Sequence, residues 1–273
     1  MRLPLTLLAV VVIELLCAGQ AVRAQSVDLN ELRARVANAA LRLITQLSDV
    51  VTEEEYDQRF TISKRKRHLT SDFLLVSYPG RKELVMVFRD VREVDGKPVR
   101  DKQDRITKLF LEPFNNAIRR AQDIHRDGLR HSVDNGRLMD PLQVITYLQS
   151  QYQGGFTFSL GDRTPSLGPD IREITLTPTP ARGKLAKPAR AWVSAATGEV
   201  VKTEVRSGFG ARAEFTTTTF GLDPVLKIRV PLEMKDELPR VSGDDFIGTA
   251  TYSNFSRFDV RTEAEVQIPD PSR

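Results

Sequence analysis

The sequence predicts an α+β fold in which a curved antiparallel β-sheet, an unclosed half-barrel, is covered by amphipathic helices. Residues 27–56 carry apolar residues at helical spacing, whereas residues 71–99 and 156–268 alternate apolar and polar positions between turn residues. A sheet with one apolar face needs a cover, and the helical stretches supply it. We find no internal repeat or linker, so residues 25–268 are expected to form one domain.

The N-terminus has the three parts of a secretory signal peptide. Arg2 precedes an apolar run over residues 3–16, and small residues follow up to Ala24. We therefore expect a signal peptide over residues 1–24, cleaved after Ala24 or Ala21, and a periplasmic or secreted protein with no stable membrane span after cleavage. Cys17, the only cysteine, is preceded by two leucines rather than by the small residue typical of a lipid-attachment site. The mature chain then has no cysteine and no disulfide.

The first mature segment, residues 27–56, is predicted to be one long amphipathic helix. Its apolar residues recur three or four positions apart, and Asp28 or Ser26 can cap its start. Two interpretations stay open: a helix packed permanently on the sheet, or a movable lid over a cavity. The contiguous acids Glu53, Glu54 and Glu55 at its end are typical of a solvated helix face.

The densest basic run is "SKRKRHL", residues 63–69. Such a run is most often a solvated strand or loop, here a partner for the acids at 53–55. Alternatively it could bind anionic lipid headgroups, at roughly 1 kcal/mol per side chain near a charged surface.

Strands and helices then alternate along the chain. Residues 71–99 are predicted to form a meander with turns at Pro79-Gly80 and Asp95-Gly96. Residues 113–148 return to a helical period, with Pro113 suited to a first helical turn. The stretch 156–268 is β-rich, and residues 269–273 form a tail.

Two β-rich segments show a clear period of two. Leu226, Ile228 and Val230 are predicted to face the apolar side of the sheet. By the same alternation, Phe215 is predicted to face that side together with Ala213 and Thr217.

No residue pattern predicts an enzyme, and we assign no catalytic residue, metal ligand or cofactor. His125 and His131 are six residues apart and would point to different faces of a helix, unlike a two-histidine metal site. Asp244-Asp245, after Gly243, is typical of a turn. The net charge of +4 is too small to indicate nucleic-acid binding.

The large apolar residues of the β-rich part are candidates for a ligand-binding cavity. Apolar and aromatic side chains line most small-molecule pockets, although the same residues can simply fill a core. The candidate ligand-binding residues are Phe156, Phe158, Trp192, Phe215, Val230, Met234, Tyr252 and Phe255.

Two short motifs resemble a known family. Trp192, Val193, Thr197 and Gly198 match a Trp-Val…Thr-Gly hairpin, and Tyr252, Asn254 and Phe255 match a late-strand Tyr-x-Asn-Phe element. In these features the chain resembles exported bacterial proteins and, more distantly, LolA/LolB-type periplasmic lipoprotein carriers. The resemblance implies an unclosed antiparallel barrel with helices as a plug, and it transfers no functional residue. The longer helical stretch at 100–150 and the more charged strands depart from a minimal carrier.

Two functions follow as expectations. The first is a non-enzymatic binding protein that carries or senses lipid or acylated protein in an apolar cavity. The second is a periplasmic protein-interaction or sensor module with a filled core and an exposed patch. A hollow interior favours the first function, and a filled one favours the second.

Overall fold

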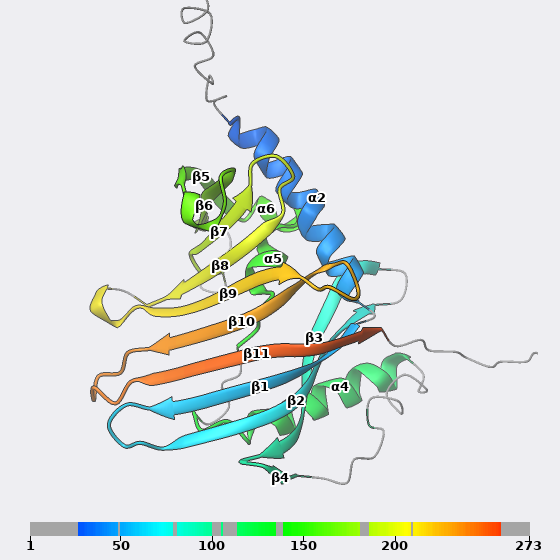
Figure 1. The fold of residues 1–273 in the computed structure, drawn as a ribbon, viewed down its shortest axis with the longest axis vertical. Helices are drawn as coiled ribbons and strands as arrows, with labels where there is room; N and C mark the ends of the chain where they lie inside the picture. The colour runs from blue at the N-terminus through cyan, green and yellow to red at the C-terminus, as the bar shows by residue number, and fades with distance from the viewer. Residues whose placement is uncertain are drawn as a thin grey trace, which may run out of the picture.

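The computed structural model describes residues 27–48, 50–78, 81–99, 105, 114–134, 139–180, 186–208 and 210–257. These residues form one open, strongly twisted sheet of eleven antiparallel strands, as the sequence predicts (Figure 1). The strand order is β4-β3-β2-β1-β11-β10-β9-β8-β7-β6-β5, so the first meander joins the C-terminal strands through the pairing of β1 with β11.

Nearly all neighbouring strands follow one another in the chain, and this local connectivity is what a meander predicts. The strands are β1 (Val50–Phe60), β2 (Lys66–Tyr78), β3 (Arg81–Val94), β4 (Lys97–Pro98), β5 (Phe156–Arg163), β6 (Ile171–Pro178), β7 (Ala189–Ser194), β8 (Val200–Ser207), β9 (Glu214–Leu222), β10 (Arg229–Leu238) and β11 (Phe246–Arg257).

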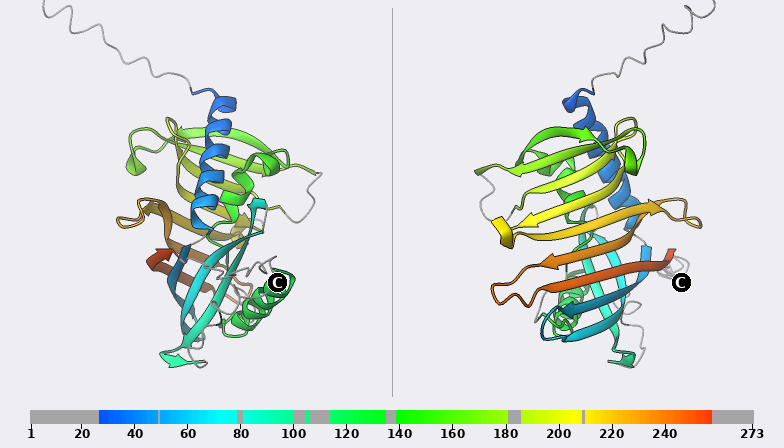
Figure 2. Two further views of the ribbon diagram at one scale, coloured as in Figure 1. Left: turned by 90° about the vertical axis from the view of Figure 1, so that its right-hand side faces the viewer. Right: turned by 60° about the vertical axis from the view of Figure 1, so that its left-hand side comes forward.

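The helices lie on one side of the sheet (Figure 2). We call this side the covered face and the opposite side the open face. The helices are α2 (Leu29–Leu47), α4 (Phe114–Leu129), α5 (Gln143–Leu148) and α6 (Ser150–Gln153). α2 and α5 contact each other. α2 also contacts β2, β3, β8 and β10, α5 contacts β7 and β8, and α4 packs against β3. No helix of the described part of the chain is long and apolar enough to cross a membrane.

α2 begins where the sequence places a cap and ends earlier than expected. The Asp28 carboxylate accepts hydrogen bonds from the backbone N–H groups of Asn30 and Glu31, at 2.7 and 3.0 Å. The expectation of a helix over residues 27–56 is wrong after Leu47, because residues 50–60 form β1. In β1 every second residue is buried, a period of two that the short acidic run concealed.

The other expected ranges differ in detail. The helical stretch predicted over residues 113–148 is divided into α4 and α5, and the short α6 follows. The predicted Asp95-Gly96 turn is confirmed, with φ values of 53° and 73°. The signal peptide 1–24, Pro79-Gly80, Pro113 and the tail 269–273 lie outside the described residues.

Two extensive apolar clusters lie between the sheet and the helices, and a smaller one includes Phe60 and Phe246. The larger joins the buried side of α2 and α5 to β5–β10, and its centre includes Val36, Ile44, Ile145, Ile174 and Val230, each fully buried. The second lies between β1, β2, β3, β10 and β11 and is built from Tyr56, Leu69, Phe73, Val91, Met234, Ala250 and Tyr252.

Candidate functional site: the two faces of the sheet

The eight candidate ligand-binding residues do not form one group. Phe156, Phe158 and Val230 belong to the larger cluster beneath α2. Met234 and Tyr252 belong to the second cluster, and Phe255 packs against both. Trp192 and Phe215 lie on the open face, away from the helices.

Trp192 is covered by cations rather than by a helix. The Arg190 guanidinium lies 5.1 Å and the Lys202 ammonium 4.7 Å from the centre of its ring. These contacts leave Trp192 only 6% exposed, although its neighbours Ala191 and Val193 point to the covered face. The lone tryptophan therefore stabilises the open face through cation–π contacts.

The alternation predicted for residues 213–217 is displaced by one residue. Thr216, Thr218 and Phe220 are buried on the covered face, so Phe215 points to the open face, where Arg206 lies 5.9 Å from its ring centre. A shift of one residue exchanges the two faces of a strand, and four successive threonines gave no hydrophobic signal to fix the register. The face predicted for Ile228 and Val230 is confirmed.

A charged pair lies inside the covered face, which the sequence did not indicate. Glu54 on β1 and Arg89 on β3 are 0% and 2% exposed and form a two-pronged ion pair, with 2.5 Å between Arg89 Nη2 and Glu54 Oε1. Arg89 Nη2 also donates to the Met139 carbonyl oxygen at 3.2 Å. The expectation that residues 53–55 form a solvated helix face is therefore wrong, because all three lie in the strand β1 and Glu54 is buried.

Aromatic and acidic groups surround this ion pair. The Tyr56 hydroxyl donates to the Asp236 carboxylate, and both residues are buried. Burial raises the pKa of Tyr56, and the negative charge of Asp236 raises it further. Burial lowers the pKa of Arg89, but Glu54 outweighs this effect, so the guanidinium remains charged. This buried polar cluster makes its part of the covered face more polar than the apolar lining typical of a small-molecule pocket.

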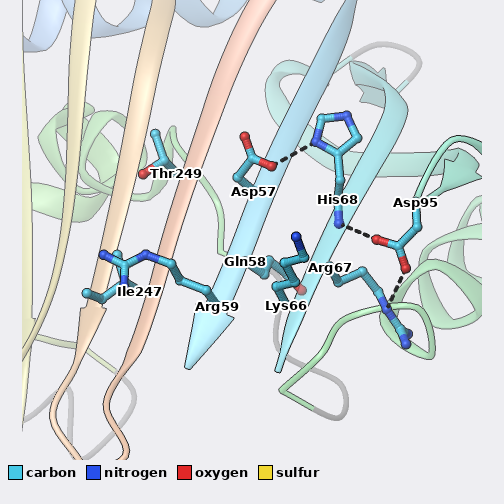
Figure 3. A pocket seen from close by; sticks show the side chains of 9 residues that line it. All are labelled: Asp57, Gln58, Arg59, Lys66, Arg67, His68, Asp95, Ile247 and Thr249. Atoms are coloured by element: carbon cyan, nitrogen blue, oxygen red, sulfur yellow. Dashed lines mark hydrogen bonds and ion pairs between the residues drawn. The ribbon is translucent and has the colours of Figure 1, made fainter. Parts of the chain in front are cut away.

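Two hollows lie on the open face. The first, about 530 Å³, lies over β1, β2 and β11 (Figure 3) and contains the 2.9 Å pair of His68 Nδ1 with Asp57 Oδ1. The second, about 480 Å³, lies over β7–β10 and is lined by Arg190, Lys202, Glu204, Phe215, Thr217, Thr219, Glu233, Lys235 and Glu237. Charges of both signs and threonine hydroxyls therefore line the second hollow.

A narrower crevice of about 130 Å³ runs beside α2. It is lined by Ala39, Arg42, Leu43, Gln46, Glu199, Val200, Leu222, Lys227, Ile228 and Arg229. Of these, Leu222 is 63% exposed, whereas Leu43 and Ile228 are buried. The crevice thus joins solvent to the edge of the core beneath α2.

The Thr-Gly turn of the Trp192 hairpin holds α2 in place. Gly198 has a φ of 75°, and a Cβ at this position would lie only 2.6 Å from Val36 N and from the Arg35 carbonyl oxygen. Only glycine permits so close an approach between the turn and the helix backbone. The glycine of this motif therefore has a structural role at the α2 contact.

Metal-ligating side chains do not gather in the described part of the chain. No group of three or more His, Cys, Asp or Glu residues there could hold a metal ion. Asp244 caps the neighbouring turn by accepting from Ile62 N and Ser63 N, at 2.7 and 3.0 Å. The turn predicted at residues 243–245 is thus confirmed.

Comparisons with known proteins found similar solved structures. No protein-family model and no curated protein matches the sequence. The structure is similar to a LolA superfamily protein from Nitrosomonas europaea, with 14% identity and a TM-score of 0.43 over 82% of this chain and 94% of that one. A DUF1329 family protein from Desulfovibrio piger aligns at 12% identity and a TM-score of 0.43, over 86% of this chain and 95% of that one.

A third similar structure is a putative outer membrane lipoprotein-sorting protein domain from Vibrio parahaemolyticus. It has 12% identity and a TM-score of 0.42, over 85% of this chain and 95% of that one. The similar structures thus include proteins of the LolA type that the two motifs resemble. At these levels of similarity the likeness concerns the fold alone.

Proposed function

We propose that the protein is an exported, non-enzymatic binding module that takes a protein partner on the open face of its sheet. This proposal rests on where the hollows of the molecule lie. Two hollows of about 530 and 480 Å³ lie on the open face, whereas the residues beneath α2 are packed into an apolar cluster. A filled core with an exposed binding surface is what the interaction module requires.

The chemistry of the second hollow favours a protein over an acyl chain. Arg190 pairs with Glu204 at 2.6 Å, and Lys235 pairs with Glu233 at 3.0 Å. An acyl chain would cover these charges and return no hydrogen bond, which costs free energy. A protein surface carries donors, acceptors and both charge signs, so it can complement such a lining and gain specificity from it.

The test is site-specific photo-crosslinking in cells of the organism that encodes the protein. A photoreactive phenylalanine replaces Thr217 or Thr219 in the second hollow, and the matched control places it at Thr45, an exposed residue on α2 that lines neither hollow nor the crevice. We expect one protein adduct from the open-face positions and none from the control. The adduct should be lost when Lys202→Glu and Lys235→Glu reverse the charge of two of the three cations in this hollow. Equal adducts at all positions, or none on the open face, would contradict the proposal.

A carrier function is the second candidate, and the crevice beside α2 is the observation that favours it. If α2 moves outward, the crevice could widen and admit an acyl chain to the core. The single tryptophan gives a direct test, because Trp192 lies on the open face whereas Phe158 lies beneath α2. Brominated fatty acids should quench the fluorescence of a Trp192→Phe/Phe158→Trp variant if the carrier function holds. If the interaction function holds, they should leave this variant unquenched.

A further inference from the structure

Two hairpin turns form one rigid unit at the end of the sheet. The β1–β2 turn (residues 61–65) and the β10–β11 turn (residues 239–245) lie together because β1 pairs with β11. Thr61 N donates to the Asp245 carbonyl oxygen at 2.9 Å, and Asp244 caps the first turn. We call residues 59–67 together with residues 239–245 the hairpin end.

The hairpin end exposes two aliphatic side chains. Ile62 is 64% exposed and Val241 is 79% exposed, one on each turn. Beneath them Phe60 and Phe246 are buried and pack edge to face, with 5.7 Å between ring centres. The two aliphatic side chains thus project from turns that adjoin a packed pair of buried aromatic rings.

The hairpin end is also strongly basic. It holds six cationic side chains and two carboxylates: Arg59, Lys64, Arg65, Lys66, Arg67 and Arg240 against Asp244 and Asp245. Both carboxylates accept hydrogen bonds from turn backbone groups.

The cations divide into fixed and free side chains. Arg65 lies 4.2 Å from the Phe60 ring centre, and Arg240 pairs with Asp134. Lys64 and Lys66 are exposed and form no ion pair within the described residues. These two lysines therefore offer unneutralised positive charge beside the exposed Ile62.

We propose that the hairpin end binds the surface of an anionic phospholipid bilayer. Aliphatic side chains ringed by Lys and Arg match the two layers of such a surface, because the cations meet phosphates and the aliphatic groups enter the boundary of the acyl chains. An acidic protein would satisfy the charge but would not require Ile62 and Val241 to project. The hairpin end is separate from the β7–β10 hollow that the crosslinking test probes, although Arg59, Lys66 and Arg67 also line the first hollow. A vesicle experiment without a protein partner therefore tests this inference apart from the proposed function.

The experiment is co-sedimentation of the mature chain, residues 25–273, with vesicles in the absence of any protein partner. Vesicles of phosphatidylcholine alone are compared with vesicles containing phosphatidylglycerol. We expect binding to the anionic vesicles that weakens as salt is added. Lys64→Ser/Lys66→Ser should weaken it by about 25-fold, at roughly five-fold for each cation. Ile62→Ser/Val241→Ser should weaken it at least ten-fold.

The matched control lies at the opposite end of β10. Leu222 and Val225 are 63% and 79% exposed, so Leu222→Ser/Val225→Ser removes similar aliphatic surface without touching the hairpin end. The control should bind as the unchanged chain does. The proposal is overturned by equal losses in the control, by absence of binding to anionic vesicles at low salt, or by full binding of the Ile62/Val241 variant. The last result would indicate a purely electrostatic surface, such as one for an acidic protein.

Discussion

Glu54 and Arg89 are the residues that most clearly separate this core from a simple apolar one. Each would carry a large desolvation cost alone, and each is stabilised by the other across β1 and β3. Arg89 also holds the segment after α4 through the Met139 carbonyl oxygen. The ion pair therefore fixes how the helical segment lies on the sheet, at little net gain in stability.

Breaking one side of this pair should be far more harmful than removing both sides. Glu54→Leu leaves a buried guanidinium unpaired and should lower the free energy of unfolding by about 3–5 kcal/mol. Glu54→Leu/Arg89→Met removes both charges and should recover most of that loss, as urea denaturation would measure. If the double variant were as unstable as the single one, desolvation would not explain the cost.

His125 should make stability depend on pH. Burial, and then the positive charge of Arg89, lower the pKa of His125 below its usual 6.5. Because the folded state resists protonation, this contribution is present above pH 6.5 and is lost as the pH falls below it. Urea unfolding between pH 7.5 and 5 should show a smaller loss for His125→Gln than for the unchanged chain.

An NMR titration tests the same point directly. Burial, and then the positive charges of Arg67 and Arg130, lower the pKa of His131 as well. His131 therefore contributes to the pH dependence of stability with the same sign as His125. The resonance of the His125 ring should titrate below pH 6.5. A value at or above 6.5 would contradict the location of His125 beside Arg89.

At the scale of elements, the contact between α2 and the Thr-Gly turn explains why the hairpin motif has its form. The turn bends through Gly198 so that its backbone meets the helix at Arg35 and Val36. The sequence predicted both the helix and the hairpin, but not their contact. The hydrophobic periodicity of the sequence does not predict which turn contacts which helix, because that contact depends on how the sheet twists.

Gly198→Ala should destabilise the protein by more than the backbone cost alone. Gly96 is the matched control, since its φ of 73° is nearly the same and nothing lies within 4 Å of a Cβ there. Gly96→Ala should cost about 1–2 kcal/mol, and Gly198→Ala about 1–3 kcal/mol more, because α2 must move. Equal losses in urea denaturation would show that the turn does not hold the helix.

The sequence pattern predicts the start of α2 correctly but not its end. The Asp28 cap and the apolar spacing predicted where the helix begins and which side it buries. Its end was missed because Glu53, Glu54 and Glu55 suggest a solvated helix, whereas a strand places Glu54 inside the sheet. That location is tolerable only because Arg89, 35 residues later, pairs with it, and a single sequence does not reveal such a distant pairing.

At the scale of the whole molecule, the order of helices, meander and β-rich half predicted the open sheet and its helical cover. The face of each strand was predictable where apolar residues alternate, as at Ile228 and Val230, and not in the threonine run beside Phe215. The candidate binding residues were chosen for size and were therefore divided between the two faces. Their predicted role in ligand binding stays a prediction.

If the covered face is filled and binding takes place outside it, the protein should hold no acyl ligand. The most direct measurement is native mass spectrometry of the mature protein from Gln25, purified gently from a bacterial periplasm, followed by organic extraction. We expect the mass of the protein without ligand, and this mass should stay unchanged after incubation with lipids and acylated peptides. A stoichiometric acyl ligand would contradict this expectation and would place the binding site beneath α2.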